Sequence, residues 1–260
     1  MYGRNRCGKI FNFILNKKIL IIYGINPLYE AIKYKKKIYK IFIIKNISNK
    51  NYKLKKIIEF SKKKKIKIIE KINFKKLIKK NHQGVFAFIN PIKFYKIEYI
   101  LPNIFFSGKI PLLLILDSIT DVRNFGSLVR TSACAGVDAI IIHNYNIVNS
   151  DSIKTSSGGL FKVPICKENN IIKIIKFLKN SGIQVIAVTE KTNYICYNIN
   201  YRNPTAFILG NEEKGISKNY LSICNNTVKI PLLKNSLSSL NVSVACGAIL
   251  YEAIRQRSLY

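Results

Sequence analysis

Polar residues that could bind or activate a substrate gather in three segments, each directly after a stretch that is predicted to be a strand. The segments span residues 117–130, 210–215 and 231–241. Glycines in the first two segments allow the backbone to approach a ligand closely. Ser and Asn at a helix start expose N–H groups that bind polar ligand atoms. Because ligands bind at the carboxyl ends of strands in doubly wound sheets, we expect the functional site among these segments.

Several common ligand-binding signatures are missing from the sequence. No GxGxxG fingerprint follows a strand, and no GxxxxGK[ST] P-loop occurs. This argues against dinucleotide dehydrogenases, common NTPases and the ordinary Rossmann-type methyltransferases. The two histidines, His82 and His143, lie outside the polar segments. We therefore expect no Ser/His/Asp catalytic set, and His143 is interpreted as a surface or structural residue.

The six cysteines indicate neither a metal site nor a disulfide framework. They lie at least 22 residues apart and form no CxxC pair, whereas zinc sites need ligands at short spacing. A long chain without a secretion signal has no need of a disulfide framework. We expect reduced, mostly buried thiols and no bound metal.

The positive charge is large and uneven. The chain has 44 Lys and Arg against 13 Asp and Glu, a net charge of +31. Residues 1–109 contain 28 basic and 4 acidic residues, whereas residues 110–260 contain 16 and 9. The basic half suggests a module that binds a polyanion such as nucleic acid. Composition drift toward Lys in an A+T-rich genome is the alternative explanation, but every arginine after Arg6 lies beyond residue 120, as expected of residues kept for bidentate or stacking roles.

No apolar run approaches the roughly 18 residues that a membrane-spanning helix needs. The longest, residues 110–116, has seven residues and contains Pro111. The apolar stretch near the N-terminus is interrupted by Asn and Lys, unlike the core of a signal peptide. We therefore expect a soluble, cytoplasmic protein.

Two alternations of strand-like and helix-like stretches must position the polar segments. The first predicts strands at 19–23, 40–44, 66–69 and 84–89 and helices at 27–34, 51–64 and 74–80. The second predicts strands at 112–116, 139–142, 184–188, 206–209 and 227–230, helices at 126–135, 171–180 and 241–257, and a short segment at 217–223. Residues 91–109, with Pro and Gly, are typical of a linker. The second alternation predicts an α/β fold with a mostly parallel sheet and helices on both faces.

The three polar segments resemble, in order, the three motifs of the SpoU (TrmH-type) RNA ribose 2′-O-methyltransferases. They read Asn124-x-Gly126 followed by Arg130, then Leu209-Gly210-Asn-Glu212-x-x-Gly215, and then Ser238-Ser239-Leu240-Asn241 after Ile230-Pro231.

Two stretches near the N-terminus, residues 23–31 and His82-Gln-Gly84, are similar to a substrate-binding domain of the ribosomal protein L30e type. That domain occurs in the branch of the family that methylates a 23S rRNA guanosine in the peptidyl-tRNA-site loop. The resemblance implies a basic extension over residues 1–18, an L30e-like domain over 19–90, a linker over 91–109 and a catalytic domain over 110–260.

The family resemblance further implies an α/β knot, a deep trefoil in which the C-terminal segment threads a loop. It implies that S-adenosylmethionine binds in a bent form among the knot loops, and that two copies of the chain form a dimer with active sites completed at the interface. By motif match, the cofactor would be held by Leu209, Gly210, Ile230 and Leu240, with Thr189 nearby.

The same resemblance implies catalytic roles. Arg130 would be the base, activated by an RNA phosphate, or would clamp the phosphate and orient the hydroxyl, since a guanidinium rarely loses its proton. Asn124 would position Arg130 or the ribose. Glu212 would fix Arg130 electrostatically, be the base itself, or only cap a helix. Ser239 and Asn241 would order the cofactor loop and contact the substrate, or serve only as N-caps.

The function that the resemblance implies is S-adenosylmethionine-dependent 2′-O-methylation of a guanosine in 23S rRNA, with rRNA and a second copy of the chain as partners. A tRNA guanosine 2′-O-methyltransferase is the nearest alternative. A non-catalytic RNA-binding protein of ribosome assembly is the second alternative. A non-RNA enzyme on a doubly wound fold is disfavoured by the missing phosphate-binding fingerprints and by the basic half.

Overall fold

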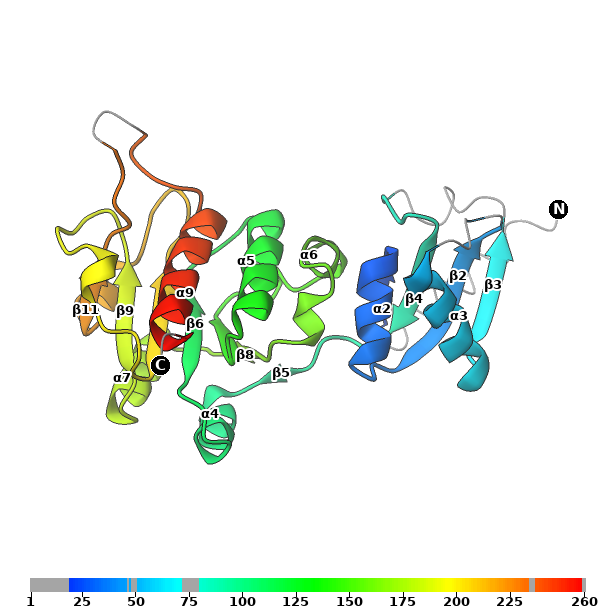
Figure 1. Cartoon of the computed structure of the whole chain (residues 1–260), viewed down its shortest axis with the longest axis horizontal. Helices are drawn as coiled ribbons and strands as arrows, with labels where there is room; N and C mark the ends of the chain where they lie inside the picture. Colours follow the sequence, from blue (N-terminus) through cyan, green and yellow to red (C-terminus); the bar gives the residue numbers. More distant parts are fainter. Residues whose placement is uncertain (1–18, 46, 48–50, 72–79, 234–236, 259–260) are drawn as a thin grey trace. The chain divides into compact units, whose positions relative to one another are not determined.

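The computed structural model forms two compact units, whose strands and helices are labelled in Figure 1. Unit 1 comprises the described residues up to Ile92 together with Val148–Lys162, and unit 2 comprises Lys93–Ile147 and the described residues from Val163 onward. The structure describes residues 19–45, 47, 51–71, 80–233 and 237–258.

Unit 1 is built on a four-stranded sheet. Its strands, in spatial order, are β1 (Leu20–Tyr23), β4 (Val85–Ile89), β2 (Ile38–Ile44) and β3 (Lys67–Lys71). Strand β4 pairs antiparallel with β1 and β2, and β2 pairs parallel with β3. Helices α2 (Ile25–Lys33) and α3 (Tyr52–Lys63) pack against each other, and α3 begins at Asn51, whose side chain accepts two backbone N–H groups of its first turn.

A short segment that the sequence did not predict as structured also belongs to unit 1. It contains helix α6 (Ser150–Thr155) and a single 3₁₀ turn, Gly159–Phe161. The carboxylate of Asp151 accepts hydrogen bonds from the Tyr23 hydroxyl and, at 2.8 Å, from the Lys80 ammonium. Helix α6 has six residues, too few to show an apolar period, and only its Asn-x-x-Ser capping box marks its start.

Unit 2 contains a seven-stranded sheet in which every pairing is parallel. In spatial order the strands are β11 (Asn226–Val228), β9 (Gln184–Val188), β10 (Thr205–Leu209), β6 (Leu112–Leu116), β7 (Ala139–Ile142), β8 (Ile165–Lys167) and β5 (Phe94–Tyr95). Strands β6, β7 and β10 are buried along their whole length, as strands covered on both faces must be. The predicted α/β fold with a parallel sheet is therefore confirmed.

Helices cover the sheet of unit 2. Helices α4 (Ile97–Phe106) and α7 (Ile171–Asn180) share one apolar core with inward side chains of the strands. Helices α5 (Val122–Ala135) and α9 (Val242–Ser258) lie side by side (Figure 1). A short helix, α8 (Lys218–Leu221), precedes β11. No helix in the described ranges is both long and apolar enough to cross a membrane.

The segment expected as a linker, residues 91–109, differs from that expectation, because it contains β5 and α4. Ile97, Leu101 and Ile104 repeat at helical spacing and are buried, but Pro102 within the helix obscured the period. The helix start is fixed by Glu168, a buried carboxylate that accepts the backbone N–H of Ile97 at 2.9 Å. The expected extension 1–18 and nearly all of the helix expected at 74–80 lie outside the described residues.

Arg257 ties the end of α9 to the start of the sheet. Its guanidinium donates hydrogen bonds of 2.8–3.0 Å to the backbone carbonyls of Ile110, Pro111, Tyr201 and Asn203. A planar group with several donors can bridge these carbonyls at once, whereas an ammonium on a flexible stem cannot reproduce that fork. Arg257 therefore has a structural role within its own chain, and its donors contact backbone carbonyls.

We predict that Arg257→Lys lowers the free energy of unfolding by about 2 kcal/mol, because hydrogen bonds from a charged donor are lost. Chemical unfolding followed by circular dichroism measures the change. The matched control is Arg123→Lys, on the exposed side of α5, which should unfold like the wild type. Equal stability of all three proteins would contradict the role given to Arg257.

Candidate functional site

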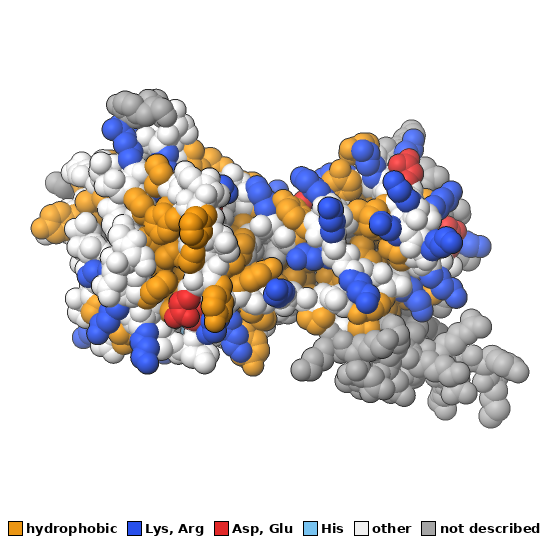
Figure 2. Space-filling view, turned by 90° about the horizontal axis from the view of Figure 1, so that it is seen from below, with side chains coloured by type: hydrophobic (Ala, Val, Ile, Leu, Met, Phe, Trp, Pro, Cys, Tyr) orange, Lys and Arg blue, Asp and Glu red, His pale blue; other side chains and the backbone are white. Residues whose placement is uncertain are grey.

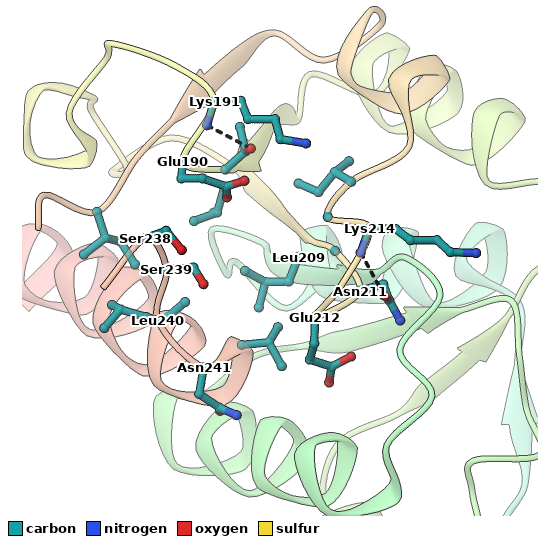
Figure 3. A pocket seen from close by; sticks show the side chains of 18 of the residues that line it. Glu190, Lys191, Leu209, Asn211, Glu212, Lys214, Ser238, Ser239, Leu240 and Asn241 are labelled. Carbon is teal, nitrogen blue, oxygen red and sulfur yellow. Dashed lines mark hydrogen bonds between the residues drawn. The ribbon is translucent and has the colours of Figure 1, made fainter. Parts of the chain in front are cut away.

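A cavity of about 520 Å³ opens at the carboxyl ends of β9 and β10 and beside the start of α9 (Figure 3). Figure 3 shows the segment Ser238–Leu240 on one side of Leu209 and the segment Asn211–Lys214 on the other. Two of the three polar segments expected to form the site thus line one cavity, at the edge of the sheet where parallel strands end. The first segment does not line the cavity and meets the other two through hydrogen bonds. The cavity is lined by Val188–Lys191, Leu209–Ile216, Ile230, Leu232 and Ser238–Val242, together with Ala245.

The loop after β10 closes on itself through the backbone. Asn211 and Gly215 exchange both backbone hydrogen bonds, at 3.1 and 2.9 Å. The Asn211 side chain also accepts the N–H groups of Glu213 and Lys214. Gly210 packs so closely on this turn that a Cβ there would lie 2.3 Å from the carbonyl carbon of Gly215. The loop therefore requires glycine at its first position, as the sequence motif has it.

The two residues directly after β6, Asp117 and Ser118, hold this loop in place. The buried carboxylate of Asp117 accepts the Ser217 N–H at 2.7 Å, and the Asp117 N–H donates to the Leu209 carbonyl at 2.9 Å. The Asn211 amide donates to the Ser118 carbonyl at 2.9 Å. These bonds fix the second polar segment against the first.

Three side chains from the three polar segments form one hydrogen-bonded chain, which we name the Asn–Glu–Asn trio. Asn241 Nδ2 donates to Asn124 Oδ1 at 3.1 Å, and Asn124 Nδ2 donates to Glu212 Oε1 at 2.7 Å. Both ends of the Asn124 amide are thereby used, so its orientation is set. The backbone N–H of Asn124 is held in turn by the N-cap of α5, Asp121, at 2.7 Å.

Asn241 also begins α9. Its Oδ1 accepts the backbone N–H of Ser243 at 2.9 Å, and its carbonyl accepts the N–H of Ala245. The two interpretations of Asn241, as an N-cap and as a site residue, are therefore compatible, since the carbonyl side of the amide caps the helix while the amide nitrogen contacts Asn124. Ser239 lines the cavity just before this cap.

Of the ten predicted site residues, eight line the cavity. They are Thr189, Leu209, Gly210, Glu212, Ile230, Ser239, Leu240 and Asn241. Asn124 contacts two of them through hydrogen bonds.

Arg130 does not line the cavity of its own chain. It lies six residues after Asn124 on α5 and is exposed. At 100° per residue this spacing turns its side chain about 120° away from Asn124 around the helix. Within the described part of the chain no ion pair joins Arg130 to Glu212, whose Oε1 accepts from Asn124 instead. The electrostatic link expected between Glu212 and Arg130 is therefore not formed within a single chain, and the role of Arg130 stays a prediction.

The sequence reasoning missed cavity residues at the end of β9 and after it. Val188 ends β9, and Glu190 and Lys191 follow Thr189, whose buried hydroxyl accepts the Lys191 N–H at 3.3 Å. The signal that could have found them is the same one used for the other segments, namely polar residues directly after a strand. Among the described residues there is no group of three His, Cys, Asp or Glu side chains arranged to hold a metal ion.

Comparisons with known sequences assign both parts of the chain. Residues 111–251 match the SpoU rRNA Methylase family, and residues 21–95 match the domain described as RNA 2′-O ribose methyltransferase substrate binding. The chain is 33% identical over 245 residues to the 23S rRNA (guanosine-2′-O-)-methyltransferase RlmB of Blochmanniella floridana, covering 91% of this chain and 95% of that protein. It is also 33% identical over 179 residues to RlmB of Escherichia coli K12, covering 68% of this chain and 73% of that protein.

The fold is similar to solved structures. The SpoU methyltransferase AviRb from Streptomyces viridochromogenes, solved in complex with AdoMet, has a TM-score of 0.79 at 21% identity, covering 95% of this chain and 94% of that chain. The tRNA-modifying enzyme TrmH/SpoU of A. aeolicus has a TM-score of 0.53 at 30% identity over 58% of this chain and 77% of that chain. The SpoU family matches more than half of this chain, and the RlmB relative of Blochmanniella floridana is similar over most of its length. The chain therefore belongs to the SpoU rRNA methylase family.

Proposed function

We propose that this chain methylates the ribose 2′-hydroxyl of a guanosine in 23S rRNA, in the peptidyl-tRNA-site loop, with S-adenosylmethionine as methyl donor. The Asn–Glu–Asn trio, which lies beside the closed loop after β10, is the observation that carries the proposal. A relative that this chain matches over 95% of its length is named a 23S rRNA (guanosine-2′-O-)-methyltransferase. The proposed substrate implies a cytoplasmic location for the protein, because bacteria such as those of the relatives make and assemble rRNA in the cytoplasm.

The cavity fits the proposed cofactor in size and in the chemistry of its lining. Its volume of about 520 Å³ lies within the usual range for small-molecule sites. Leu209, Ile230 and Leu240 offer apolar contacts for an adenine ring, and Thr189 and Ser239 offer hydroxyl groups for the sugar and the amino-acid end. When bound, S-adenosylmethionine supplies a methyl group on a positively charged sulfur, an electrophile with a neutral leaving group.

The residues of the chain must then align and activate the other reactant. A ribose hydroxyl is a poor nucleophile and needs an oriented position and a proton acceptor. Glu212 supplies the acceptor: Oε1 accepts from Asn124, while Oε2 accepts no hydrogen bond within the described part of the chain and can take the hydroxyl proton. Asn124 holds that carboxylate, and Asn241 holds Asn124.

Arg130 serves the active site of a second copy of the chain in this proposal. It is exposed on α5, and its helical neighbour α9 exposes the apolar side chains of Val244 and Tyr251 at a spacing of two helical turns. Such a face on two packed helices suits a symmetric dimer interface. From the partner, the guanidinium would clamp an RNA phosphate and orient the ribose hydroxyl.

The path of the C-terminal segment supports the proposed deep trefoil knot. The chain runs from β11 past the cavity, meets Asn124 through Asn241, and then follows α5 as α9 until Arg257 reaches the start of β6.

For unit 1, the proposal is an L30e-like domain that binds RNA. Figure 2 shows many Lys and Arg side chains and few acidic ones on the part that contains α2 and α3, and such a surface binds phosphates without sequence choice.

The proposal is tested by transfer of labelled methyl from S-adenosylmethionine to 23S rRNA, folded tRNA and a control without RNA. We predict transfer to a 23S rRNA guanosine and, for Glu212→Gln, a rate reduced about 100-fold or more at unchanged cofactor affinity, since a proton acceptor contributes that much. Transfer to tRNA alone would overturn the substrate and keep the chemistry. Tight RNA binding without any transfer would favour an assembly protein instead.

The shared active site gives a second prediction. Arg130→Ala and Glu212→Gln should each be nearly inactive, but dimers co-expressed from both should recover about one quarter of the wild-type rate, because half the dimers are mixed and each contains one complete site. Methyl transfer by the purified mixture measures the recovery. No recovery in a mixture that contains the mixed dimer would show that Arg130 acts within its own chain.

A further inference from the structure

Besides the cavity, unit 2 has a groove beside β5, the last strand of the sheet. Its volume is about 570 Å³. We name it the β5 groove. Its lining is mainly three lysines and three aromatic residues: Lys93, Lys96, Lys167, Phe94, Tyr95 and Tyr99. It shares no lining residue with the cavity beside β10.

Aromatic rings stand exposed at this groove and beside it. Tyr99, on the first turn of α4, is 75% exposed, and Tyr145, after β7, is 45% exposed. The Lys167 ammonium lies 3.5 Å from the centre of the Tyr145 ring, and Phe94 meets that ring edge-on at 6.1 Å. These contacts fix the Tyr145 ring in place with part of its surface open to solvent. An ordered, exposed aromatic ring beside a cation is what a nucleobase needs for stacking.

The charge of the β5 groove is positive. Glu168 is buried and already pairs with Lys96 at 2.8 Å while it caps the start of α4. Lys93 and Lys167 form no ion pair with an acidic side chain in the part of the chain that the structure describes. Their ammonium groups, which lie over the rings of Tyr95 and Tyr145, remain available to phosphates.

The groove and the cavity both lie at carboxyl ends of strands in one sheet. In the groove, Lys96 directly follows β5, Lys167 ends β8 and Asn169 follows it. All seven strands of unit 2 are parallel, so the carboxyl ends of β5, β8 and β10 lie on one side. Strand β5 is four strand positions away from β10, which corresponds to about 19 Å. An RNA strand whose target ribose lies at the cavity can therefore continue along this edge to the groove.

We propose that the β5 groove binds an unpaired segment of the RNA substrate outside the target nucleotide. Bases stack on Tyr99 and Tyr145, and phosphates pair with Lys93 and Lys167. Unpaired segments are the form of RNA whose bases can stack on aromatic side chains. The inference rests on the proposed function in taking RNA as the substrate. A protein partner is the weaker occupant, because protein interfaces favour aromatic residues but are depleted in Lys.

The test measures the binding of the full-length protein to a fluorescently labelled single-stranded oligouridine and to an RNA duplex. We predict that Tyr99→Ala and Tyr145→Ala each raise the Kd for the single strand about fivefold or more, since stacking on one ring contributes at least that factor. Tyr99→Phe, which retains the ring, should bind like the wild type. Affinity for the duplex should not change, because its bases are already paired and stacked.

Two further variants sharpen the test. Phe106→Ala removes a ring that is 89% exposed on the same helix but outside the groove, and it should leave the affinity unchanged. Lys167→Ala should reduce the slope of log K against log salt by about 0.7, the value for one phosphate contact on a single strand.

The outcomes separate the groove from the proposed function. Wild-type affinity for the single strand in Tyr99→Ala, Tyr145→Ala and Lys167→Ala would overturn the proposal and leave the groove to a protein partner. Equal losses for duplex and single strand would also overturn it, because they would exclude stacking. Failure of the wild type to transfer methyl to any RNA would instead contradict the proposed function, whatever these variants bind.

Discussion

The side-chain amide of Asn124 is the interaction on which the site depends. It joins Glu212, 88 residues later, to Asn241, 117 residues later, so three segments remote in sequence meet at one point. An amide can do this because it donates from nitrogen and accepts at oxygen, whereas a carboxylate or an ammonium offers only one of these functions. Replacing the amide would leave Glu212 and Asn241 without the link that orients both.

The rest of unit 2 makes that meeting point possible. Wholly apolar strands are buried under helices on both faces, so the parallel sheet is rigid and its carboxyl edge collects the polar loops. At that edge the loop after β10 closes only because Gly210 has no side chain, and Asp117 anchors the far end of the loop through Ser217. The carboxyl ends of β8 and β5 lie farther along the same side of the sheet, and the residues beside them are lysines and aromatic residues.

Much of the fold was predictable because its signals are local. Strands β6, β7 and β9 have the bounds that their apolar runs predicted, and so does helix α7. Strands β5 and β8 have only two and three residues and are held by pairing within the sheet, so no local pattern marked them. In the site, residue types at strand ends identified the cavity. The motif match placed Arg130 there too, but Arg130 does not line the cavity, because the position of α5 against the sheet is set by tertiary packing that the motif does not describe.

The central claim is that Asn124 acts through Glu212, and a double-mutant cycle of single-turnover methyl transfer tests it most directly. The rates of Asn124→Ala, Glu212→Gln and the double variant would be measured at saturating RNA and cofactor. If Asn124 serves to hold the Glu212 carboxylate, the double variant reacts about as fast as Glu212→Gln alone, as residues of one unit do. A double variant slower by the product of the two single losses would contradict the account.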